Sequence, residues 1–425
     1  MSLRAMAEAA RAGGRALQAL PSAHRVAAMH RVANALVDHA DEIVQANQRD
    51  IEAVSAAVAS GEMSPALAAR LPLTETKLAT LAQGIRAIAD APEPLGRVLE
   101  ARELAPGLVL RKETAPLGAL LIIFESRPDA LPQIAALALR SGNALVLKGG
   151  REAQHSNTVL HRVIVQALAP DVPAETIALV HTREDLASLL ELDDVIDLVI
   201  PRGSNALVRY IQANTRIPVL GHADGICHVF VDAAADPAMA HRIVLDSKTD
   251  YPAACNAMET LLVHAEVWDT LGHPLVGALQ QAGVTVFAGP GAEALGVEPA
   301  ASLAHEYGDM ACAVAVVDDV DHAIHHIHRY GSAHTDAIVT DDPTIAARFR
   351  DGVDSACVFI NASTRFADGF RFGLGAEVGI STSRIHARGP VGVQGLLTTR
   401  YKLSGSGDTV APFSSGQRQF THKML

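Results

Sequence analysis

The chain has 425 residues, which predicts two or three domains because a single hydrophobic core rarely serves so long a chain. Hydrophobic residues make up 49% of the sequence and charged residues 19%, as is typical of soluble globular proteins. The net charge of −12 argues against nucleic acid as the main partner, although a local basic pocket for a phosphorylated ligand stays open. No apolar run approaches the roughly 18 residues of a spanning helix, so we expect no membrane partner.

The first 96 residues are predicted to be helical. Apolar residues recur there at spacings of three and four, as in Val26, Met29, Val32 and Leu36. The alanine- and arginine-rich beginning lacks the apolar core of a signal peptide, and we interpret it as an amphipathic helix instead of a targeting segment. A hairpin follows, because residues 99–104 and 108–113 flank Ala105-Pro106-Gly107. Its many charges indicate that it projects from the body.

From residue 117 short apolar segments alternate with helical ones. Strands are predicted over 117–124, 143–147, 176–180, 195–200 and 218–220, with helices over 130–140, 152–168, 185–191 and 205–213. Strands that are apolar throughout and alternate with helices indicate a parallel sheet covered on both faces. Sheets of this class commonly bind nucleotides at the carboxyl ends of their strands.

A second α/β block is predicted after Gly225. Its strands are expected over 227–231, 261–264, 284–288, 311–317, 337–340 and 356–361, with helices between them. Residues 392–403 are predicted to form a late extended arm, and the polar tail after Ser404 is expected to be loose.

Two loops in the first block have the composition of phosphate-binding turns. Lys148 ends one strand before two glycines, and Arg202 and Gly203 stand between another strand and a helix. Backbone N–H groups at a helix start attract phosphate, and a nearby cation strengthens the attraction. Neither loop is GxGxxG or GxxxxGK[ST], so each taken alone is interpreted as a plain turn in preference to a ligand site.

Four widely spaced cysteines form neither a zinc pattern nor a disulfide framework, which indicates a reducing cytosol. Cys227, Cys312 and Cys357 lie in apolar strand sequence and are predicted to be small buried hydrophobes. Cys255 is predicted to lie at the start of a helix that Pro252 begins, where the helix dipole favours the nucleophilic thiolate. Position alone leaves a reactive and an inert Cys255 equally open.

Four histidines crowd one predicted helix: His322, His325, His326 and His328. The first and third are one turn apart, a spacing that suits a metal. No cysteine or carboxylate pattern supports a metal, so we interpret these histidines as a solvated helical face and expect no metal site.

Several ordered segments together carry a family resemblance. They are residues 123–129 (IFESRPD), 147–153 (LKGGREA), 200–204 (IPRGS), 248–257 (KTDYPAACNA), 361–369 (NASTRFADG) and 376–382 (AEVGIST). With these segments the chain resembles the γ-glutamyl phosphate reductases of the aldehyde dehydrogenase superfamily, from about residue 5 to residue 405. The resemblance implies NADPH-dependent reduction of L-glutamate 5-phosphate to L-glutamate 5-semialdehyde, a step of proline biosynthesis in the cytoplasm.

The resemblance also implies an α/β, aldehyde dehydrogenase-like fold with two Rossmann-like domains and a small β oligomerisation arm. The NADPH-binding domain is expected over 1–98 and 117–225, and the catalytic domain over 226–388. The arm is expected over 99–116 with 389–410, and the loose tail over 411–425. A homodimer or homotetramer is expected, and association with glutamate 5-kinase stays open.

Site residues follow from the same resemblance. Cys255 aligns with the superfamily nucleophile, and Ser126 and Asn256 are candidate oxyanion donors. The cofactor is expected to contact Lys148, Gly149, Arg151, Gly203, Ser204 and Glu377. The best candidates for substrate binding are Arg127, Asp250, Asn361 and Arg365.

One departure from the superfamily bears on the reaction. Hydrolytic aldehyde dehydrogenases have a glutamate that activates the deacylating water, and its position here is His222. A reductase that accepts an acyl phosphate needs no such base, so the departure favours reduction. A hydrolytic aldehyde dehydrogenase and a non-catalytic nucleotide-binding scaffold are the alternatives, since fold alone excludes neither.

Overall fold

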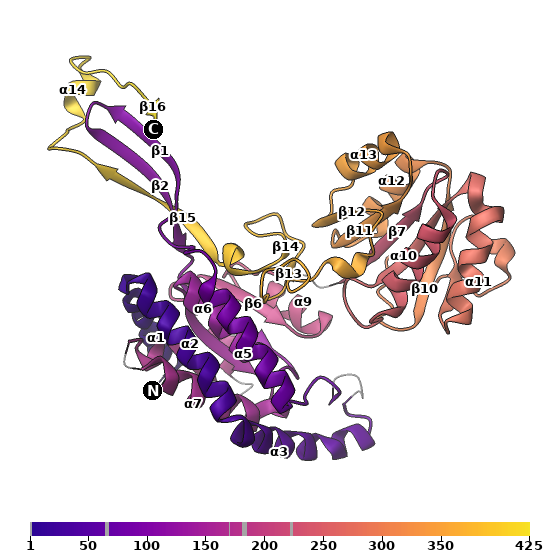
Figure 1. Ribbon diagram of the computed structural model, residues 1–425, viewed down its shortest axis with the longest axis horizontal. Helices are drawn as coiled ribbons and strands as arrows, with labels where there is room; N and C mark the ends of the chain where they lie inside the picture. Colours follow the sequence, from indigo (N-terminus) through magenta and orange to yellow (C-terminus); the bar gives the residue numbers. More distant parts are fainter. Residues whose placement is uncertain (1, 64–67, 170, 181–184, 222–223) are drawn as a thin grey trace. The chain divides into compact units, whose positions relative to one another are not determined.

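The computed structural model describes residues 2–63, 68–169, 171–180, 185–221 and 224–425 (Figure 1). The chain divides into two compact units. Unit 1 contains Met1–Leu220, Leu374–Gly379 and Val391–Leu425, and unit 2 contains Gly221–Gly373 and Ile380–Pro390. The finer assignment of a cofactor domain and a catalytic domain stays a prediction. Among the described residues, no helix combines the length and the apolar character that crossing a membrane requires.

Unit 1 is built on a four-stranded parallel sheet. Its strand order is β5-β4-β3-β6, and the strands are β3 (Ala119–Phe124), β4 (Ala144–Gly149), β5 (Ile177–Val180) and β6 (Leu198–Arg202). All six residues of β3 and all six of β4 are buried, as predicted from their continuous apolar sequence. Because β3 lies between β4 and β6 and all run parallel, the loops after these three strands meet at one edge.

Helices cover both faces of this sheet, and the predicted helices are present. They are α1 (Leu3–Ala19), α2 (Ser22–Asp38), α3 (Ala40–Ala59), α5 (Glu75–Asp90), α6 (Ala130–Ser141), α7 (Gln154–Leu168), α8 (Asp185–Leu190) and α9 (Asn205–Ala213). Helices α1, α8 and α9 contribute to one apolar core with β3 and β4. Two glycines let α1 approach closely, since a Cβ on Gly13 would lie 2.5 Å from Thr176 Oγ1.

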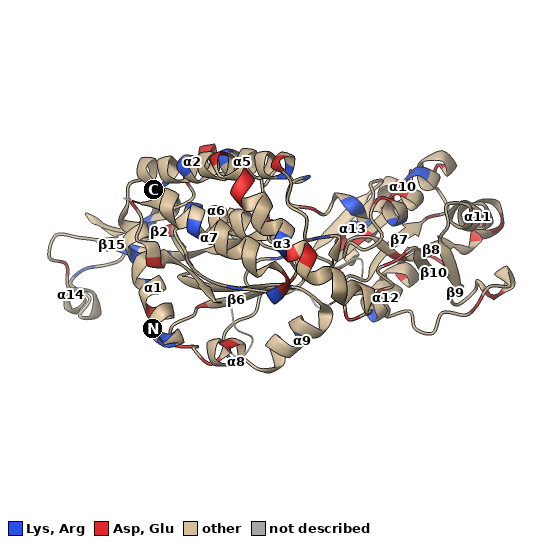
Figure 2. Cartoon of the chain, turned by 90° about the horizontal axis from the view of Figure 1, so that it is seen from below, with Lys and Arg blue, Asp and Glu red and all other residues tan. Residues whose placement is uncertain are grey.

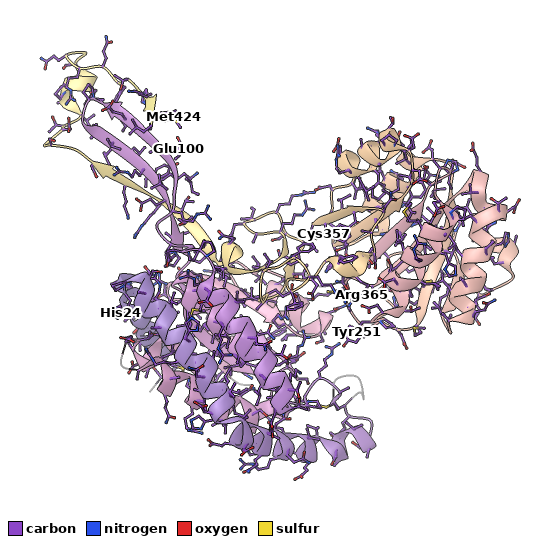
Figure 3. The ribbon with its side chains drawn as sticks, viewed as in Figure 1. His24, Glu100, Tyr251, Cys357, Arg365 and Met424 are labelled. Atoms are coloured by element: carbon purple, nitrogen blue, oxygen red, sulfur yellow. The ribbon has the colours of Figure 1, made fainter. Side chains whose placement is uncertain are left out.

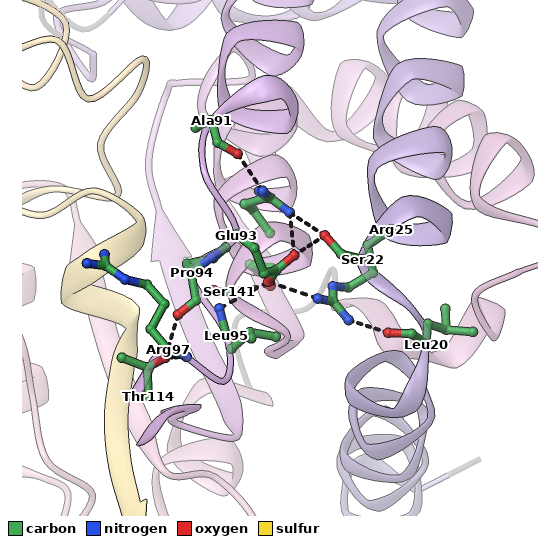
Figure 4. Close-up of polar contacts among 12 residues, drawn as sticks. Leu20, Ser22, Arg25, Ala91, Glu93, Pro94, Leu95, Arg97, Thr114 and Ser141 are labelled. Carbon is green, nitrogen blue, oxygen red and sulfur yellow. Dashed lines mark hydrogen bonds and ion pairs between the residues drawn. The ribbon is translucent and has the colours of Figure 1, made fainter. Parts of the chain in front are cut away.

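A buried polar network ties the helices to the start of the arm (Figure 4). Arg25 Nη2 donates to Glu93 Oε1 at 2.9 Å, and Arg140 Nη1 donates to Glu93 Oε2 at 3.0 Å. Burial acts to raise the pKa of Glu93, but hydrogen bonds from Ser22 and the Leu95 N–H, together with both arginines, outweigh it and hold that pKa below its usual value. Glu93 therefore neutralises two buried guanidinium groups.

The projecting arm is a second, antiparallel sheet of unit 1 with the order β15-β2-β1-β16. The predicted hairpin forms β1 (Val98–Ala105) and β2 (Leu108–Pro116), and β15 (Leu397–Ser404) pairs with β2 along its whole length. The prediction of a loose tail is wrong at its end. There β16 (Lys423–Met424) returns to pair with β1, and Glu100 and Met424 are neighbours in Figure 3. The unpaired backbone N–H and C=O groups at the edge of β1 form hydrogen bonds with this end of the tail.

Unit 2 contains a six-stranded parallel sheet with the order β12-β11-β7-β8-β10-β9. Its strands are β7 (Cys227–Val231), β8 (Met258–His264), β9 (Thr285–Ala288), β10 (Ala311–Val317), β11 (Thr335–Val339) and β12 (Cys357–Ile360). Helices α10 (Pro237–Thr249) and α11 (His273–Gln281) pack on one face, and α12 (Val320–Tyr330) and α13 (Pro343–Gly352) pack on the other. Lysine and arginine are interspersed with aspartate and glutamate over both units (Figure 2).

The prediction that the α12 histidines form a solvated face is wrong for His326. His322, His325 and His328 are exposed, but His326 is buried and its ring lies 5.5 Å from that of His228 in β7. Burial lowers the pKa of His326 to about 3. Among the described residues, no group of three or more His, Cys, Asp or Glu side chains is arranged to hold a metal ion.

Candidate active site

Cys255 lies in a turn, and the prediction that it begins a helix is wrong. Helix α10 ends at Thr249, residues 250–257 form turns, and β8 begins at Met258. Because α10 runs antiparallel to the strands, its carboxyl end is at the edge where β8 must begin, so the chain has to reverse at once. The Cys255 thiol is therefore not activated by a helix dipole. The turn is held by its own backbone, with Ala254 N–H bonded to Tyr251 C=O at 3.0 Å.

Cys255 nevertheless differs from the other cysteines in exposure. Its side chain is half-buried, whereas Cys227, Cys312 and Cys357 are buried, as predicted. Burial raises the pKa of Cys312 to about 12 and that of Cys227 well above its usual value. Of the four thiols, Cys255 is the one that a substrate can reach.

Two residues that sequence reasoning missed support the backbone of Cys255. Cys227 Sγ donates a hydrogen bond to the Cys255 carbonyl oxygen at 3.3 Å. Gly225 lies so close that a Cβ there would be 2.2 Å from the same oxygen and 2.7 Å from Cys255 Cβ. The segment before β7 therefore lies directly against the cysteine turn. His222 falls in this segment but outside the described residues, so its expected role stays a prediction.

Asn256 is buried and directed toward a neighbouring loop. Its Nδ2 donates to Ala367 C=O at 2.9 Å, and that loop also carries Arg365. The side chain of Ser126, at the end of β3 in unit 1, likewise donates to Glu152 Oε1 at 3.1 Å. Both candidate oxyanion donors are thus engaged in holding loops, which weakens the prediction for each.

Two of the four predicted substrate residues, Asp250 and Arg365, contact each other. Asp250 Oδ2 accepts from Arg365 Nε at 3.1 Å and from Arg371 Nη2 at 3.1 Å, and the hydrogen bond from Arg371 is the main reason that the pKa of Asp250 is lowered. The Arg365 guanidinium lies 5.8 Å from the centre of the Tyr251 ring, and both residues are marked in Figure 3. Arg371, which sequence reasoning missed, completes a charged cluster beside the cysteine turn.

Asn361 does not belong to this cluster. It follows the carboxyl end of β12, and its side chain exchanges hydrogen bonds of 2.9 Å with the backbone of Thr340. Cys255 precedes the amino end of β8, so the two residues lie at opposite edges of a parallel sheet. Arg127 follows β3 in unit 1, and its side chain has no ion pair within the described residues.

The cofactor candidates converge at the carboxyl edge of the unit 1 sheet. Lys148 and Gly149 end β4, Arg151 begins the next turn, and Gly203 and Ser204 connect β6 to α9. Glu377 joins them through Arg202, whose Nη1 lies 3.9 Å from Glu377 Oε1. Burial lowers the pKa of Lys148, and nearby carboxylates partly oppose this shift.

The chemistry of this edge suits a dinucleotide. A Cβ on Gly149 would lie 2.4 Å from Asn157 Nδ2, and one on Gly203 would lie 2.5 Å from Glu125 Oε2, so neither position has room for a side chain. A buried lysine and the N-terminus of α9 supply positive potential. Glu125 and Glu152, which sequence reasoning passed over, lie at the same edge. For Glu125 the available signal was a charged residue directly after a buried strand.

A family model described as "Aldehyde dehydrogenase family" matches residues 1–305. The γ-glutamyl phosphate reductase of Synechococcus sp. (strain JA-3-3Ab) is 50% identical over 428 residues, which cover 99% of this chain and 94% of the relative. The chain belongs to the γ-glutamyl phosphate reductases of the aldehyde dehydrogenase family. Members of the aldehyde dehydrogenase family use NAD or NADP.

Two further comparisons extend this membership. A crystal structure of γ-glutamyl phosphate reductase from Thermotoga maritima shows the same fold, with a TM-score of 0.91, 33% sequence identity, and coverage of 96% of this chain and 100% of that one. Delta-1-pyrroline-5-carboxylate synthase 1 of Oryza sativa is 56% identical over all of this chain, which spans only 59% of that relative. The chain thus corresponds to a little over half the length of such relatives.

Proposed function

We propose that the chain catalyses NADPH-dependent reduction of L-glutamate 5-phosphate to L-glutamate 5-semialdehyde and phosphate, in the pathway to proline. The observation that carries the proposal is the half-buried Cys255 thiol, held in a turn while the other three thiols are buried. The family membership supports the substrate and the direction of reaction.

In the proposed mechanism the Cys255 thiolate attacks the acyl carbon of the mixed anhydride. Phosphate leaves with the electrons of the broken C–O bond, and a thioester on Cys255 remains. NADPH, when bound, supplies the hydride that reduces the thioester. The resulting thiohemiacetal oxyanion is stabilised by the Cys255 backbone N–H, and its collapse breaks the C–S bond, releases the aldehyde and regenerates the thiolate.

Chain residues orient both ligands in this proposal. Lys148, Gly149, Arg151, Gly203, Ser204 and Glu377 are the residues proposed to hold the dinucleotide. At the substrate end, the Asp250, Arg365 and Arg371 cluster binds the α-ammonium and α-carboxylate groups, since it presents charges of both signs beside the cysteine turn. Arg127 is proposed to bind the leaving phosphate.

The decisive experiment compares Cys255→Ala with Cys312→Ala, a buried cysteine in β10. The first variant should lose on the order of a thousandfold or more in NADPH-dependent turnover, because the nucleophile is removed, while it still binds NADPH. The second should retain turnover. Near-normal turnover of Cys255→Ala contradicts the mechanism. Oxidation of the semialdehyde without phosphate contradicts the reductase assignment and favours a hydrolytic enzyme.

We also propose a homodimer or homotetramer assembled through the arm. Strand β15 forms one edge of the arm sheet, and its residues 398–404 are exposed, so its outer backbone groups are open to a second strand. Light scattering of the full chain, and of a chain carrying Thr399→Pro in β15, tests this proposal. The proline variant should dissociate to a smaller species, and an unchanged mass contradicts the proposal.

Association with glutamate 5-kinase in the cytoplasm is the remaining proposal. An acyl phosphate hydrolyses readily, so direct transfer from the enzyme that makes it protects the substrate. The free cysteines accord with a reducing compartment. Co-sedimentation of the two purified proteins tests the association, and independent sedimentation contradicts it.

A further inference from the structure

The carboxylate of Glu125 is bound at the N-terminus of α9. Ser204 N–H donates to Glu125 Oε2 at 3.0 Å. The two residues meet because β3 and β6 are parallel neighbours, with Phe124 opposite Arg202 and Glu125 N–H bonded to Arg202 C=O at 3.0 Å. Glu125 therefore leaves the end of one strand and places its anionic group on the helix that follows the other.

The space for this carboxylate depends on Gly203. A Cβ on Gly203 would lie 2.5 Å from Glu125 Oε2 and 2.8 Å from Leu207 Cδ2. Ser204 is the N-cap of α9, and its own Oγ accepts from Leu207 N–H at 3.4 Å. The Ser204 hydroxyl thus caps the first turn of α9, while the Ser204 backbone N–H is bonded to the Glu125 carboxylate.

A phosphate makes the same kind of contact that Glu125 makes here. Backbone N–H groups at a helix start and the positive end of the helix dipole bind carboxylates and phosphates alike. The edge already carries other carboxylates, since Glu152 and Asp185 join Glu125 in the electrostatic surroundings of Lys148. A dinucleotide that brings a doubly charged pyrophosphate to this edge meets an anion already bonded to the helix.

We infer that Glu125 is a positioning residue that competes with the cofactor, its carboxylate leaving Ser204 N–H when the pyrophosphate binds. The inference rests on the proposed dinucleotide function of this edge. Glu125 then keeps the loop between β6 and α9 in its binding conformation while it lowers the affinity for the dinucleotide, and a lower affinity favours release of the oxidised cofactor.

The test measures binding and not turnover. NADPH fluorescence titrations compare the wild-type chain with Glu125→Gln and with Glu175→Gln, which removes an exposed carboxylate elsewhere on unit 1. Glu125→Gln should bind NADPH about tenfold more tightly, because a neutral amide is a weaker competitor for the helix N-terminus. Glu175→Gln should bind as the wild type does.

A second ligand tests whether the change in affinity depends on the pyrophosphate. Adenosine 2′-phosphate carries no pyrophosphate, so Glu125→Gln should leave its dissociation constant unchanged. Glu125→Asp keeps the charge on a side chain one methylene shorter, and it should bind NADPH with an affinity between those of the wild type and Glu125→Gln. If Glu125→Gln fails to fold, Glu125→Asp provides the test of the inference.

Unchanged or weaker NADPH binding by folded Glu125→Gln overturns the inference and makes Glu125 a plain cap or a contact of the cofactor. A gain that extends equally to adenosine 2′-phosphate overturns it as well, since the effect is then general electrostatics. A wild-type chain that binds no NADPH refutes the proposed function instead, so the two failures are distinguishable.

Discussion

Cys227 Sγ donates a hydrogen bond to the carbonyl oxygen of Cys255 at 3.3 Å, joining the first residue of β7 to the turn that carries the proposed nucleophile. Because burial raises the pKa of Cys227 well above its usual value, this thiol stays protonated and acts as a donor at neutral pH. The two cysteines lie 28 residues apart and have different proposed roles. Cys227 holds the turn in place, and Cys255 is the nucleophile.

Cys227→Ala should remove the hydrogen bond to the Cys255 carbonyl oxygen and leave the nucleophile in place. We expect turnover to fall by about fivefold, since a single neutral hydrogen bond contributes about 1 kcal/mol. We expect Cys255 to remain the thiol that an alkylating reagent modifies in the native protein. Peptide mapping after alkylation, alongside steady-state kinetics, measures both. Loss of labelling at Cys255 in this variant contradicts the assignment.

Gly225→Ala should lower turnover strongly, although it adds only one methyl group. The added Cβ would meet the Cys255 carbonyl oxygen at 2.2 Å and Cys255 Cβ at 2.7 Å, so the cysteine turn has to move. A shift of about 1 Å at a reacting group can cost about a hundredfold in rate. Gly277→Ala, where nothing lies within 4 Å of the added Cβ, is the matched control. Equal activity of the two variants contradicts this prediction.

Lys248 and Glu259 form a fully buried ion pair that closes the two ends of the cysteine turn, with Nζ and Oε2 3.2 Å apart. Tyr307 N–H also donates to Glu259 Oε2, at 3.0 Å. Lys248→Met leaves a buried carboxylate without its cation and should cost about 3–5 kcal/mol of unfolding free energy at pH 8, where the carboxyl group of Glu259 is ionised in the wild type. Urea denaturation measures this loss, and Lys248→Met/Glu259→Gln should recover part of it.

The cost of Lys248→Met should depend on pH. Burial raises the pKa of Glu259 to about 7, even against the opposing pull of Lys248. A carboxyl group whose pKa is raised in the folded state favours folding at low pH, and that contribution is lost as pH rises through about 7. Lys248→Met should therefore be less destabilised at pH 5 than at pH 8. A cost that is equal at both pH values contradicts a carboxylate left unpaired.

His326 should make the protein sensitive to mild acid. Burial, together with the neighbouring His228, His322 and His325, lowers its pKa to about 3. The unfolded chain therefore takes up a proton below about pH 6.5 that the folded chain does not, so stability falls as pH drops from about 6.5 toward 3, by roughly 2–3 kcal/mol at pH 4.5. His326→Leu should reduce this loss, whereas His325→Leu at an exposed position should not. Denaturation curves at pH 7 and 4.5 measure the difference.

The sequence alone was sufficient to predict most of the fold, and it supplied the candidate site residues, which stay predictions. The uniformly apolar runs of β3 and β4 identify buried parallel strands, since such strands are shielded on both faces. The contrast between Cys255 and three cysteines in apolar strand sequence is also visible before folding. Lys148 and the glycines at the strand ends of unit 1 are also visible in the sequence, but each loop taken alone is typical of a plain turn.

Tertiary structure decided what depends on contacts between distant segments. The turn at Cys255 replaces the predicted helix because α10 ends at the edge where β8 must begin. His326 is buried because α12 packs its side against β7, and the tail forms β16 because the edge of β1 was open. Glu125 reaches α9 only because β3 and β6 are neighbours. Local sequence determines periodicity and burial, whereas the pairing of groups far apart in the chain appears only when the strands are ordered in space.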